Sequence, residues 1–463
     1  MVNINIKSDS RSIKEGDIFV ALKMVNGDGH SYIPKAIENG AKTIVVDHGE
    51  YNYEGVEVIK VEDTRAYLTQ YLIDHFKQYI DEMTVIAFTG TNGKSTSVHF
   101  IDQALNELGI PCASIGTVGF FMNGEKVKYL ANTSPDIGEM YDLLMTAYNA
   151  GIRHVALEAS SHGFGYHRLE GITYDYAAFT NLTRDHLDFH KTVENYAACK
   201  RQLFERLKPT GLACINYDDP KHDYFTLAQN RNILFGFDGG EVQVTSYDMN
   251  QDGTHFTLSI EGKEYPFYTQ VIGKYNVSNM IPIILFLKDM GIEMDKIKEV
   301  IPTLTAPDGR IEAIPYGTNR IYIDYAHTPD GMEKILTNVK AVTKGNMYVV
   351  FCCRGNRDIG RRPQMMKLAT ELCEYAIVTQ DNFYGESYTS VLRDMLTECT
   401  KDNYEVNWNR EEAIHRGIDL LKENDSLLVL GKGHEDYLIL PNKKKIHFYD
   451  KEVILNYIQE KTH

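Results

Sequence analysis

The sequence predicts an α/β protein of three domains, with a parallel sheet in the second and a smaller doubly wound sheet in the third. Segments rich in strand formers alternate with amphipathic segments along most of the 463 residues. A glycine-bearing loop at residues 89–96 follows one such strand and opens a helix, which is the setting of a phosphate-binding loop. Later predicted strands end in polar or glycine-rich residues, as strands of ligand-binding parallel sheets do.

The predicted domains cover residues 1–83, 84–307 and 308–463, in agreement with a usual ~150 residues per domain. The third begins at the turn-rich sequence Pro307-Asp308-Gly309. Strands are predicted in the first domain at 44–46 and 56–59, in the second at 84–88, 155–157, 176–179 and 212–215, and in the third at 320–323, 347–351, 376–379 and 426–430. A helix is predicted at 66–79.

The composition is that of a globular protein and argues against nucleic-acid binding and membrane insertion. Contents of 43% hydrophobic and 24% charged residues are typical of a globular protein with ample core. A formal net charge of −16 argues against a nucleic-acid partner, because an acidic surface repels phosphate backbones. No apolar stretch reaches the ~20 residues needed to cross a bilayer, so we expect no membrane insertion. Seven scattered cysteines and an N-terminus unlike a signal peptide fit a cytoplasmic protein.

The most informative motif is Thr89-Gly90-Thr91-Asn92-Gly93-Lys94-Ser95-Thr96. The strand at 84–88 precedes it, and the apolar spacing of 97–108 predicts a helix behind it. Glycines let the backbone close round phosphate oxygens, while the helix N-terminus stabilises anions. Lys94 is expected to reach the outer phosphates, and Ser95 or Thr96 to ligate Mg²⁺. Phe88 replaces the first glycine of the general pattern, which favours one sub-class of ATP-using proteins.

Polar clusters follow several other predicted strands. Glu158 comes at the end of one strand in the second domain, where a carboxylate near a phosphate loop could hold Mg²⁺. The segment 181–190, which contains His186, follows another; by itself, His186 could equally be a structural histidine. In the third domain, clusters follow at 324–329, 354–358 and 431–436. Because polar clusters follow several strands of the same sheet, we predict a ligand site in each of the two sheets.

Together these motifs resemble the Mur ligase superfamily, and most closely the MurE-type ligases that add the third amino acid of the peptidoglycan stem peptide. The resemblance runs from about residue 8 to about residue 440 and implies a Rossmann-like third domain. In the first domain it rests on the order of individually weak motifs, among them Asp9-Ser10-Arg11 and Asp28-Gly29-His30. It implies that the first domain binds a UDP-sugar, with Ser10 near the uridine.

The resemblance implies an ATP site and a metal site. ATP would be bound by Gly90, Thr91, Asn92, Gly93, Lys94, Ser95, Thr96, Asn276, Asn279, Arg310 and Asp324. Mg²⁺ would be held by Ser95, Glu158, His186 and a carbamate on Lys200, with Lys94, Lys200 and His186 as the catalytic residues. An ammonium beside Mg²⁺ has a lowered pKa, and the neutral amine can add CO₂ to become an anion. Without the resemblance, we would interpret Lys200 as a solvated lysine on a helix.

The resemblance also implies two further substrate sites. The UDP-sugar dipeptide would contact Asn132, Thr133, Ser134, Ser160 and Arg168, although Tyr166 replaces a glutamine common in the family. The incoming amino acid would contact Arg357, Asp381, Asn382, Gly431 and Glu435. Diaminopimelate-adding relatives carry Asp-Asn-Pro-Arg, whereas this chain has Asp381-Asn382-Phe383-Tyr384. A tyrosine cannot form a charge-assisted fork to a carboxylate, so we expect lysine or another diamino acid rather than meso-diaminopimelate.

The implied reaction transfers the γ-phosphate of ATP to a D-glutamate carboxylate, and the amino group then attacks the acyl phosphate. Closure of the third domain would bring the amine to the acyl phosphate. The expected enzyme is a cytoplasmic monomer of peptidoglycan biosynthesis, with only small-molecule substrates as partners. Two alternatives are a superfamily ligase with a substrate outside the cell wall and a non-catalytic nucleotide-binding scaffold.

Overall fold

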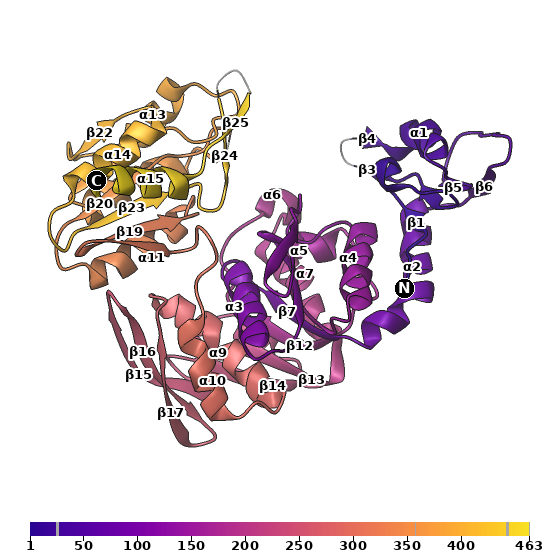
Figure 1. Ribbon diagram of the computed structural model, residues 1–463, viewed down its shortest axis with the longest axis horizontal. Coiled ribbons are helices and arrows are strands. Elements are labelled where there is room, and N and C mark those ends of the chain that lie inside the picture. Colours follow the sequence, from indigo (N-terminus) through magenta and orange to yellow (C-terminus); the bar gives the residue numbers. More distant parts are fainter. Residues whose placement is uncertain (25–26, 357, 441–443, 463) are drawn as a thin grey trace. The chain divides into compact units, whose positions relative to one another are not determined.

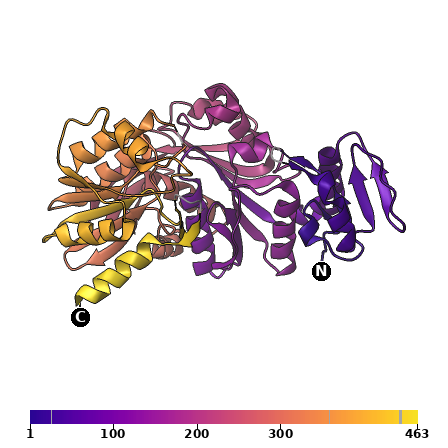
Figure 2. The ribbon, with the colours of Figure 1, turned by 90° about the horizontal axis from the view of Figure 1, so that it is seen from above.

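The computed structural model describes residues 1–24, 27–356, 358–440 and 444–462. These residues form two compact units, the first comprising 1–243 with 279–292 and the second 244–278 with 293–463. Figures 1 and 2 show the chain coloured from the indigo N-terminus to the yellow C-terminal helix. The predicted α/β class with three sheet-based regions is confirmed. The domain bounds at 83/84 and 307/308 stay a prediction, because the two units divide the chain differently.

The first region of unit one is a small parallel sheet with the strand order β1-β2-β5-β6. Its strands are β1 (Ile6–Lys7), β2 (Ile18–Val20), β5 (Thr43–Val46) and β6 (Glu57–Lys60). A short hairpin of β3 (Lys23–Met24) and β4 (Gly27–Asp28) accompanies it, with the helical segments η1 (Ser10–Ser12), η2 (Gly29–Tyr32) and α1 (Ile33–Glu38). Figure 1 shows α1, β5 and β6 together in this indigo part.

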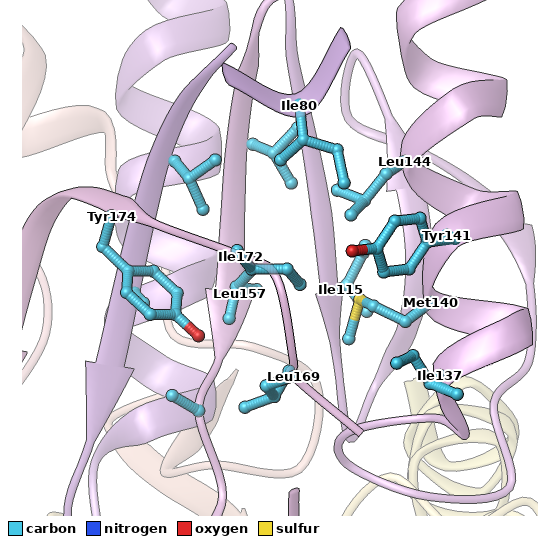
Figure 3. Close-up of a cluster of buried hydrophobic side chains, with 14 of the residues drawn as sticks. Ile80, Ile115, Ile137, Met140, Tyr141, Leu144, Leu157, Leu169, Ile172 and Tyr174 are labelled. Atoms are coloured by element: carbon cyan, nitrogen blue, oxygen red, sulfur yellow. The ribbon is translucent and has the colours of Figure 1, made fainter. Parts of the chain in front are cut away.

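Helix α2 (Thr64–Asp81) ties this sheet to the next region. It begins two residues earlier than predicted, because the Asp63 side chain caps the backbone N–H groups of Arg65 and Ala66. Its apolar face consists of Leu68, Leu72, Phe76 and Ile80, all buried in one core with α4 (Ile137–Asn149). Figure 3 shows Met140 and Tyr141 of α4 pointing toward Ile115 and Leu157 of the central sheet. One continuous core therefore joins the small sheet to the central one.

Nine successive strands of the eleven-stranded central sheet have the order β10-β9-β8-β11-β7-β12-β13-β14-β15. These strands are β7 (Thr84–Thr89), β8 (Cys112–Gly116), β9 (Gly119–Met122), β10 (Glu125–Lys128), β11 (His154–Glu158), β12 (Tyr174–Phe179), β13 (Leu207–Asn216), β14 (Arg231–Gly236) and β15 (Val242–Asn250). Its helices include α3 (Lys94–Glu107), α5 (Ser161–Gly165), α6 (Leu187–His190), α7 (Val193–Glu205) and α8 (His222–Phe225). Strand β7 lies between β11 and β12 and pairs with both in parallel. The carboxyl ends of these three strands therefore meet at one edge.

Unit two contains the antiparallel hairpin β16 (Gly253–Ile260) and β17 (Lys263–Thr269), which the sequence analysis did not predict. Helix α9 (Lys274–Asp289) has residues in both units, and α10 (Met294–Val300) with η3 (Ile301–Thr303) follows. The described residues contain no helix both long and apolar enough to cross a bilayer.

The last sheet has the order β18-β19-β23-β20-β21-β22, and all but the β18–β19 pair are parallel. Its strands are β18 (Glu312–Tyr316), β19 (Asn319–Asp324), β20 (Met347–Phe351), β21 (Tyr375–Val378), β22 (Tyr404–Val406) and β23 (Ser426–Leu430). Also present are α11 (Pro329–Val342), α12 (Arg361–Leu372), α13 (Tyr388–Leu396), α14 (Arg410–Leu420), α15 (Asp450–Thr462) and the hairpin β24 (Tyr437–Ile439) with β25 (Lys445–His447). The doubly wound arrangement predicted for this region is confirmed.

Leu72→Ala tests the joint made by α2. The substitution removes a fully buried side chain from the shared core, so we expect a loss of about 2–5 kcal/mol in unfolding free energy. Thermal and urea unfolding measure it, and Gln78→Ala, an exposed position on the same helix, is the matched control. Equal stability of the two variants would contradict this account of the joint.

Candidate active site

The predicted phosphate loop lies between the end of β7 and the start of α3, at the centre of the central sheet. Gly90 and Gly93 have φ angles of 150° and 91°, a backbone region that L side chains rarely adopt. A Cβ on Gly90 would lie 1.9 Å from Thr180 Oγ1, and one on Gly93 2.4 Å from Asn279 Oδ1. Both glycines are therefore required by conformation and by space. Gly93 is the N-cap of α3, so Ser95 and Thr96 fall in its first turn.

The end of β12 fixes the shape of this loop. The main-chain N–H of Thr91 donates to Asn181 O at 2.8 Å, and that of Asn92 donates to Asn181 Oδ1 at 3.0 Å. Thr180 Oγ1 donates to Asn92 O at 2.6 Å. The sequence analysis did not identify Thr180 or Asn181 as supports of the loop. Their only signal was their place directly after a predicted strand of the same sheet.

Two lysine side chains converge on one carbonyl oxygen of the loop. Lys94 Nζ donates to Gly90 O at 2.8 Å, and Lys200 Nζ donates to the same oxygen at 2.6 Å. Lys200 is only 1% exposed, so the interpretation as a solvated helix lysine is wrong. Burial, and then the charge of Lys94, lower the pKa of the Lys200 amine well below its usual value. Both causes lie within the protein, so the lowered pKa does not require a metal ion.

Glu158 lies at the end of β11 as a buried carboxylate. Its side chain is 2% exposed and accepts hydrogen bonds from Thr117 N at 2.7 Å and Thr117 Oγ1 at 3.3 Å. A Cβ on Gly116 would lie 2.3 Å from Glu158 Oε1, so this glycine makes room for the carboxylate. Thr117 Oγ1 also lies 2.9 Å from Thr133 Oγ1, which links Glu158 to the predicted dipeptide-binding segment.

A pocket of about 280 Å³ opens beside these groups. Eight of the predicted site residues line it, namely Lys94, Asn132, Thr133, Ser134, Ser160, Arg168, His186 and Lys200. Four further residues complete the wall: Ser161, His162, Tyr166 and Tyr196. The structure thus brings together residues from five separate segments of the chain. Lining of one pocket is a matter of position, and the role of each residue stays a prediction.

Hydrogen bonds among the lining residues order the dipeptide-binding side. Ser134 Oγ donates to Glu158 O at 2.9 Å and lies 2.8 Å from Ser160 Oγ. Ser160 in turn caps α5 by accepting from Gly163 N at 2.9 Å. Arg168 Nη1 donates to Ser134 O at 3.1 Å, so its guanidinium is held at the wall of the pocket. The wall carries hydroxyls and a cation, which suit an anionic peptide.

His186 occupies an unusual position for a histidine. It has a φ of 53° at the N-cap of α6, its side chain is 47% exposed, and its Nε2 lies 3.4 Å from Asp185 Oδ2. Its ring packs edge-on against His162 at 4.7 Å. Tyr196 was missed as a site residue, yet its hydroxyl lies 3.1 Å from Thr91 Oγ1 and its ring lies 4.5 Å from Lys200 Nζ. Its signal was its place four residues before Lys200.

Ser10 lies outside this pocket, in η1 of the first sheet region. It is 7% exposed, and its main-chain oxygen accepts a hydrogen bond from Asn39 Nδ2 at 2.8 Å. Among the described residues of the pocket wall, none comes from the first 83 residues. The predicted uridine contact of Ser10 therefore stays a prediction.

The predicted nucleotide contacts Arg310 and Asp324 belong to unit two. Arg310 directly precedes Ile311, whose main-chain N–H donates a hydrogen bond to Asp324. Asp324 Oδ2 accepts from Ile311 N at 2.8 Å and Oδ1 from Ala326 N at 2.7 Å. Burial raises the pKa of Asp324, while the charge of Arg310 opposes that rise. The Arg310 guanidinium lies 4.7 Å from the ring centre of Tyr325. Asn276, also in this unit, is 2% exposed and donates to Ile272 O at 2.8 Å.

The predicted amino-acid residues Asp381, Asn382 and Glu435 form a buried cluster around Arg354. Arg354 Nη2 donates to Glu435 Oε1 at 2.8 Å and to Gly431 O at 3.1 Å, and its Nε lies 3.7 Å from Asp381 Oδ2. Asn382 Nδ2 donates to Glu435 Oε2 at 3.2 Å. Burial raises the pKa of Asp381, but the charges of Arg354, Arg410 and Lys432 outweigh it and lower that pKa overall.

Arg354 was not identified from the sequence, although it stands in the polar cluster after β20. No periodicity marks a buried arginine, and its partners come from residues up to 81 positions away. Arg357, predicted to hold the α-carboxylate, lies outside the described residues.

Three domain families match successive parts of the chain. Residues 4–76 match the Mur ligase family catalytic domain, residues 88–286 the Mur ligase middle domain, and residues 309–433 the Mur ligase glutamate ligase domain.

Curated relatives match nearly the whole chain. A UDP-N-acetylmuramoyl-L-alanyl-D-glutamate–2,6-diaminopimelate ligase of Clostridium perfringens is 38% identical, and the alignment covers 99% of this chain and 95% of the relative. The Aquifex aeolicus protein of the same name is 34% identical over 97% of this chain and 92% of the relative. A solved ligase of that name has a TM-score of 0.70 and 27% identity, covering 99% and 95% of the two chains. MurF of Thermotoga maritima in complex with ADP shares the fold, with a TM-score of 0.70 and 16% identity over 98% and 97%.

Lys200→Met tests the neutral buried amine. Between the lowered folded pKa and about 10.4, the unfolded amine holds a proton that the folded amine lacks. The unfolded state thus binds more protons, so the stability of the wild type rises with pH by up to about 1.4 kcal/mol per pH unit in this window. The variant should lose this rise, as measured by urea unfolding at several pH values in CO₂-free buffer. Parallel stability curves for the two proteins would contradict a neutral Lys200.

Proposed function

Because the chain belongs to the Mur ligase family, we propose that it is the MurE-type ligase that adds a diamino acid to UDP-N-acetylmuramoyl-L-alanyl-D-glutamate in peptidoglycan synthesis. Members of the family are ATP-dependent amide ligases, and relatives named for this reaction match the chain over almost its full length. One observation carries the proposal to this chain: Lys94 of the phosphate loop and the dipeptide-binding segment line one pocket, and Thr117 links that segment to Glu158 by hydrogen bonds. We place its work in the cytoplasm, as a monomer acting on small molecules.

The donor set at the pocket suits a hard divalent cation. Glu158 is a buried carboxylate whose described hydrogen-bond donors belong to Thr117 and are neutral, so its charge is not offset by a neighbouring cation there. We infer that Ser95, Glu158, His186 and a carbamate on Lys200 would hold Mg²⁺, which prefers oxygen ligands. When bound, the ion would neutralise negative charge on the phosphates of ATP.

Burial prepares Lys200 for carbamate formation. A neutral Nζ can attack CO₂, so that a nitrogen–carbon bond forms and one proton leaves the nitrogen for solvent. The product is an anion, which a metal ion beside it would stabilise. A protonated ammonium has no lone pair for this attack. The depressed pKa of Lys200 is therefore the property that the modification requires.

The reaction joins a carboxylate to an amine, whose direct condensation fails because oxide is a very poor leaving group. We propose that the free D-glutamate carboxylate attacks the γ-phosphorus of ATP, which releases ADP and gives an acyl phosphate. The acceptor amine then attacks the acyl carbon and releases phosphate. Lys94 and the α3 N-terminus would stabilise the transferring phosphoryl group, while Arg168 would hold the dipeptide.

The acceptor is proposed to be lysine or a similar diamino acid without a distal carboxylate. The relatives' names favour 2,6-diaminopimelate, but residues 383 and 384 offer no guanidinium to bind a second carboxylate. Phe383 is 2% exposed and packs 4.7 Å from Tyr388 in an aromatic cluster with Trp408. Three buried guanidiniums of this unit are held by internal carboxylates: Arg354 by Glu435, Arg362 by Glu386, and Arg410 by Asp450.

A substrate panel tests the proposed reaction. With the UDP-sugar dipeptide and ATP, phosphate release should require an amino acid, and L-lysine or ornithine should support it at least tenfold better than meso-diaminopimelate. Lys94→Ala should abolish turnover with every acceptor, because the transferring phosphate loses its cation. Product masses from each reaction identify the amide. Robust turnover with meso-diaminopimelate and none with lysine would overturn the acceptor, and no turnover with any UDP-sugar would overturn the function.

Tyr384→Arg tests the basis of acceptor choice. An arginine at this position could form the fork to a distal carboxylate that tyrosine cannot form. We expect the kcat/KM ratio of meso-diaminopimelate to lysine to rise at least tenfold. Tyr384→Leu, which removes the phenol without adding a guanidinium, is the matched control and should leave that ratio low. An equal rise in both variants would assign the effect to the lost tyrosine instead.

A further inference from the structure

Two histidines and two aspartates alternate in a small cluster of the first sheet region. Asp28 ends β4, His30 lies in η2, and Asp47 and His48 directly follow β5. His30 is 7% exposed, whereas the side chain of His48 is 52% exposed. Within the described part of the chain, Asp28, His30 and His48 are the one group of three or more metal-type side chains with ligand atoms all within 4.8 Å.

Each imidazole faces a carboxylate oxygen at both of its nitrogens. On one side, Asp28 Oδ1 lies 2.6 Å from His30 Nδ1, and Asp28 Oδ2 lies 3.2 Å from His48 Nε2. On the other, Asp47 Oδ1 lies 2.5 Å from His48 Nδ1 and 3.3 Å from His30 Nε2. The two rings lie 3.9 Å apart, so the four side chains form one closed set.

Three ligand atoms of this set converge beside Asp28. His30 Nδ1 and His48 Nε2 both face the Asp28 carboxylate, and the ligand atoms of these three residues all lie within 4.8 Å of one another. Imidazole nitrogens and carboxylate oxygens are both common metal ligands. A divalent cation at this point would take one nitrogen from each ring and one oxygen of Asp28. The other nitrogen of each ring faces Asp47 Oδ1.

We propose that Asp28, His30 Nδ1 and His48 Nε2 bind a divalent transition-metal ion, for which Zn²⁺ is the best match. Zinc takes histidine nitrogen and aspartate oxygen together, whereas Mg²⁺ and Ca²⁺ select oxygen ligands. Asp47 would be the outer carboxylate that orients both rings, an arrangement common to histidine-ligated metals. The exposure of His48 leaves a path for the ion and room for a water ligand.

This site would act on the first sheet region rather than on the chemistry of the pocket. Of its members, none lines the 280 Å³ pocket, and the inference does not rest on the proposed function. The ion would join the segment 28–30 to residue 48 beyond the end of β5, two stretches otherwise linked there by side-chain hydrogen bonds. Binding of the folded state alone stabilises a protein, so Zn²⁺ should raise the unfolding temperature of this chain.

Metal titration of the full-length protein without a histidine tag tests the proposal. After treatment with chelator and its removal, Zn²⁺ binding is followed by calorimetry, and Co²⁺ binding by its visible absorption. We expect His48→Ala to bind one ion fewer than the wild type. His447→Ala is the matched control, because His447 is an exposed histidine with one carboxylate partner, Glu452, at 2.7 Å. It should bind as many ions as the wild type.

Asp47→Asn provides a second variant that keeps all three ligands. Loss of an outer-shell carboxylate should weaken Zn²⁺ binding at this site about 10–100-fold without abolishing it. Zinc should raise the unfolding temperature of the wild type and of His447→Ala, and raise that of His48→Ala less. Equal ion counts in the wild type and His48→Ala, or an affinity unchanged by Asp47→Asn, would overturn the site and leave a hydrogen-bonded cluster. In that cluster the Asp47 N–H, 3.4 Å from His30 Nε2, would be a donor to the ring.

Discussion

The carbonyl oxygen of Gly90 is the point on which the candidate active site depends. Two lysine amines, from the loop itself and from α7, donate to this one oxygen. Two full positive charges at such short range inside the protein would repel strongly, because the interior screens charge poorly. Burial, and then the charge of Lys94, lower the pKa of Lys200 well below its usual value. The loop geometry that places Gly90 thus contributes to the lowered pKa of Lys200.

That geometry follows from the sheet. Parallel strands β11, β7 and β12 end at one edge, so Glu158, the phosphate loop and Thr180 with Asn181 meet there. The two loop glycines allow close approach to Thr180 and Asn279, which larger residues would prevent. The polar residues of this site follow individual strands in the sequence, and the order of the strands in the sheet brings them together. The strand order places the polar ends side by side, and hydrogen bonds from Thr180 and Asn181 then fix the shape of the loop.

The region of the C-terminal sheet contains buried ion pairs, in contrast to the two lysine amines at the phosphate loop. Its buried residues include Arg354, Asp381, Arg410, Lys432 and Glu435, with Asp450 beside Arg410. Removing one partner of a buried pair leaves an uncompensated charge at a cost of about 3–5 kcal/mol, so such a network is retained as a unit. Within it, Arg354, Arg362 and Arg410 each have an internal carboxylate partner. The acceptor proposed above rests on this internal pairing.

By itself, the sequence determined the α/β class, the strand-loop-helix at 84–107 and most of the residues that line the pocket. The class and the strand-loop-helix follow from local signals, namely glycine spacing, apolar periodicity and polar strand ends. Most of the pocket residues were expected only from the resemblance to the Mur ligases. Tertiary structure alone decided the burial of Lys200, the network around Arg354, the supports Thr180 and Asn181, and the meeting of Asp28 with His48. Each of these depends on residues far apart in the chain, and burial and pKa are set by neighbours that no local pattern specifies. For that reason the sequence supplied the candidate site residues, while the packed chain decided their burial and their partners.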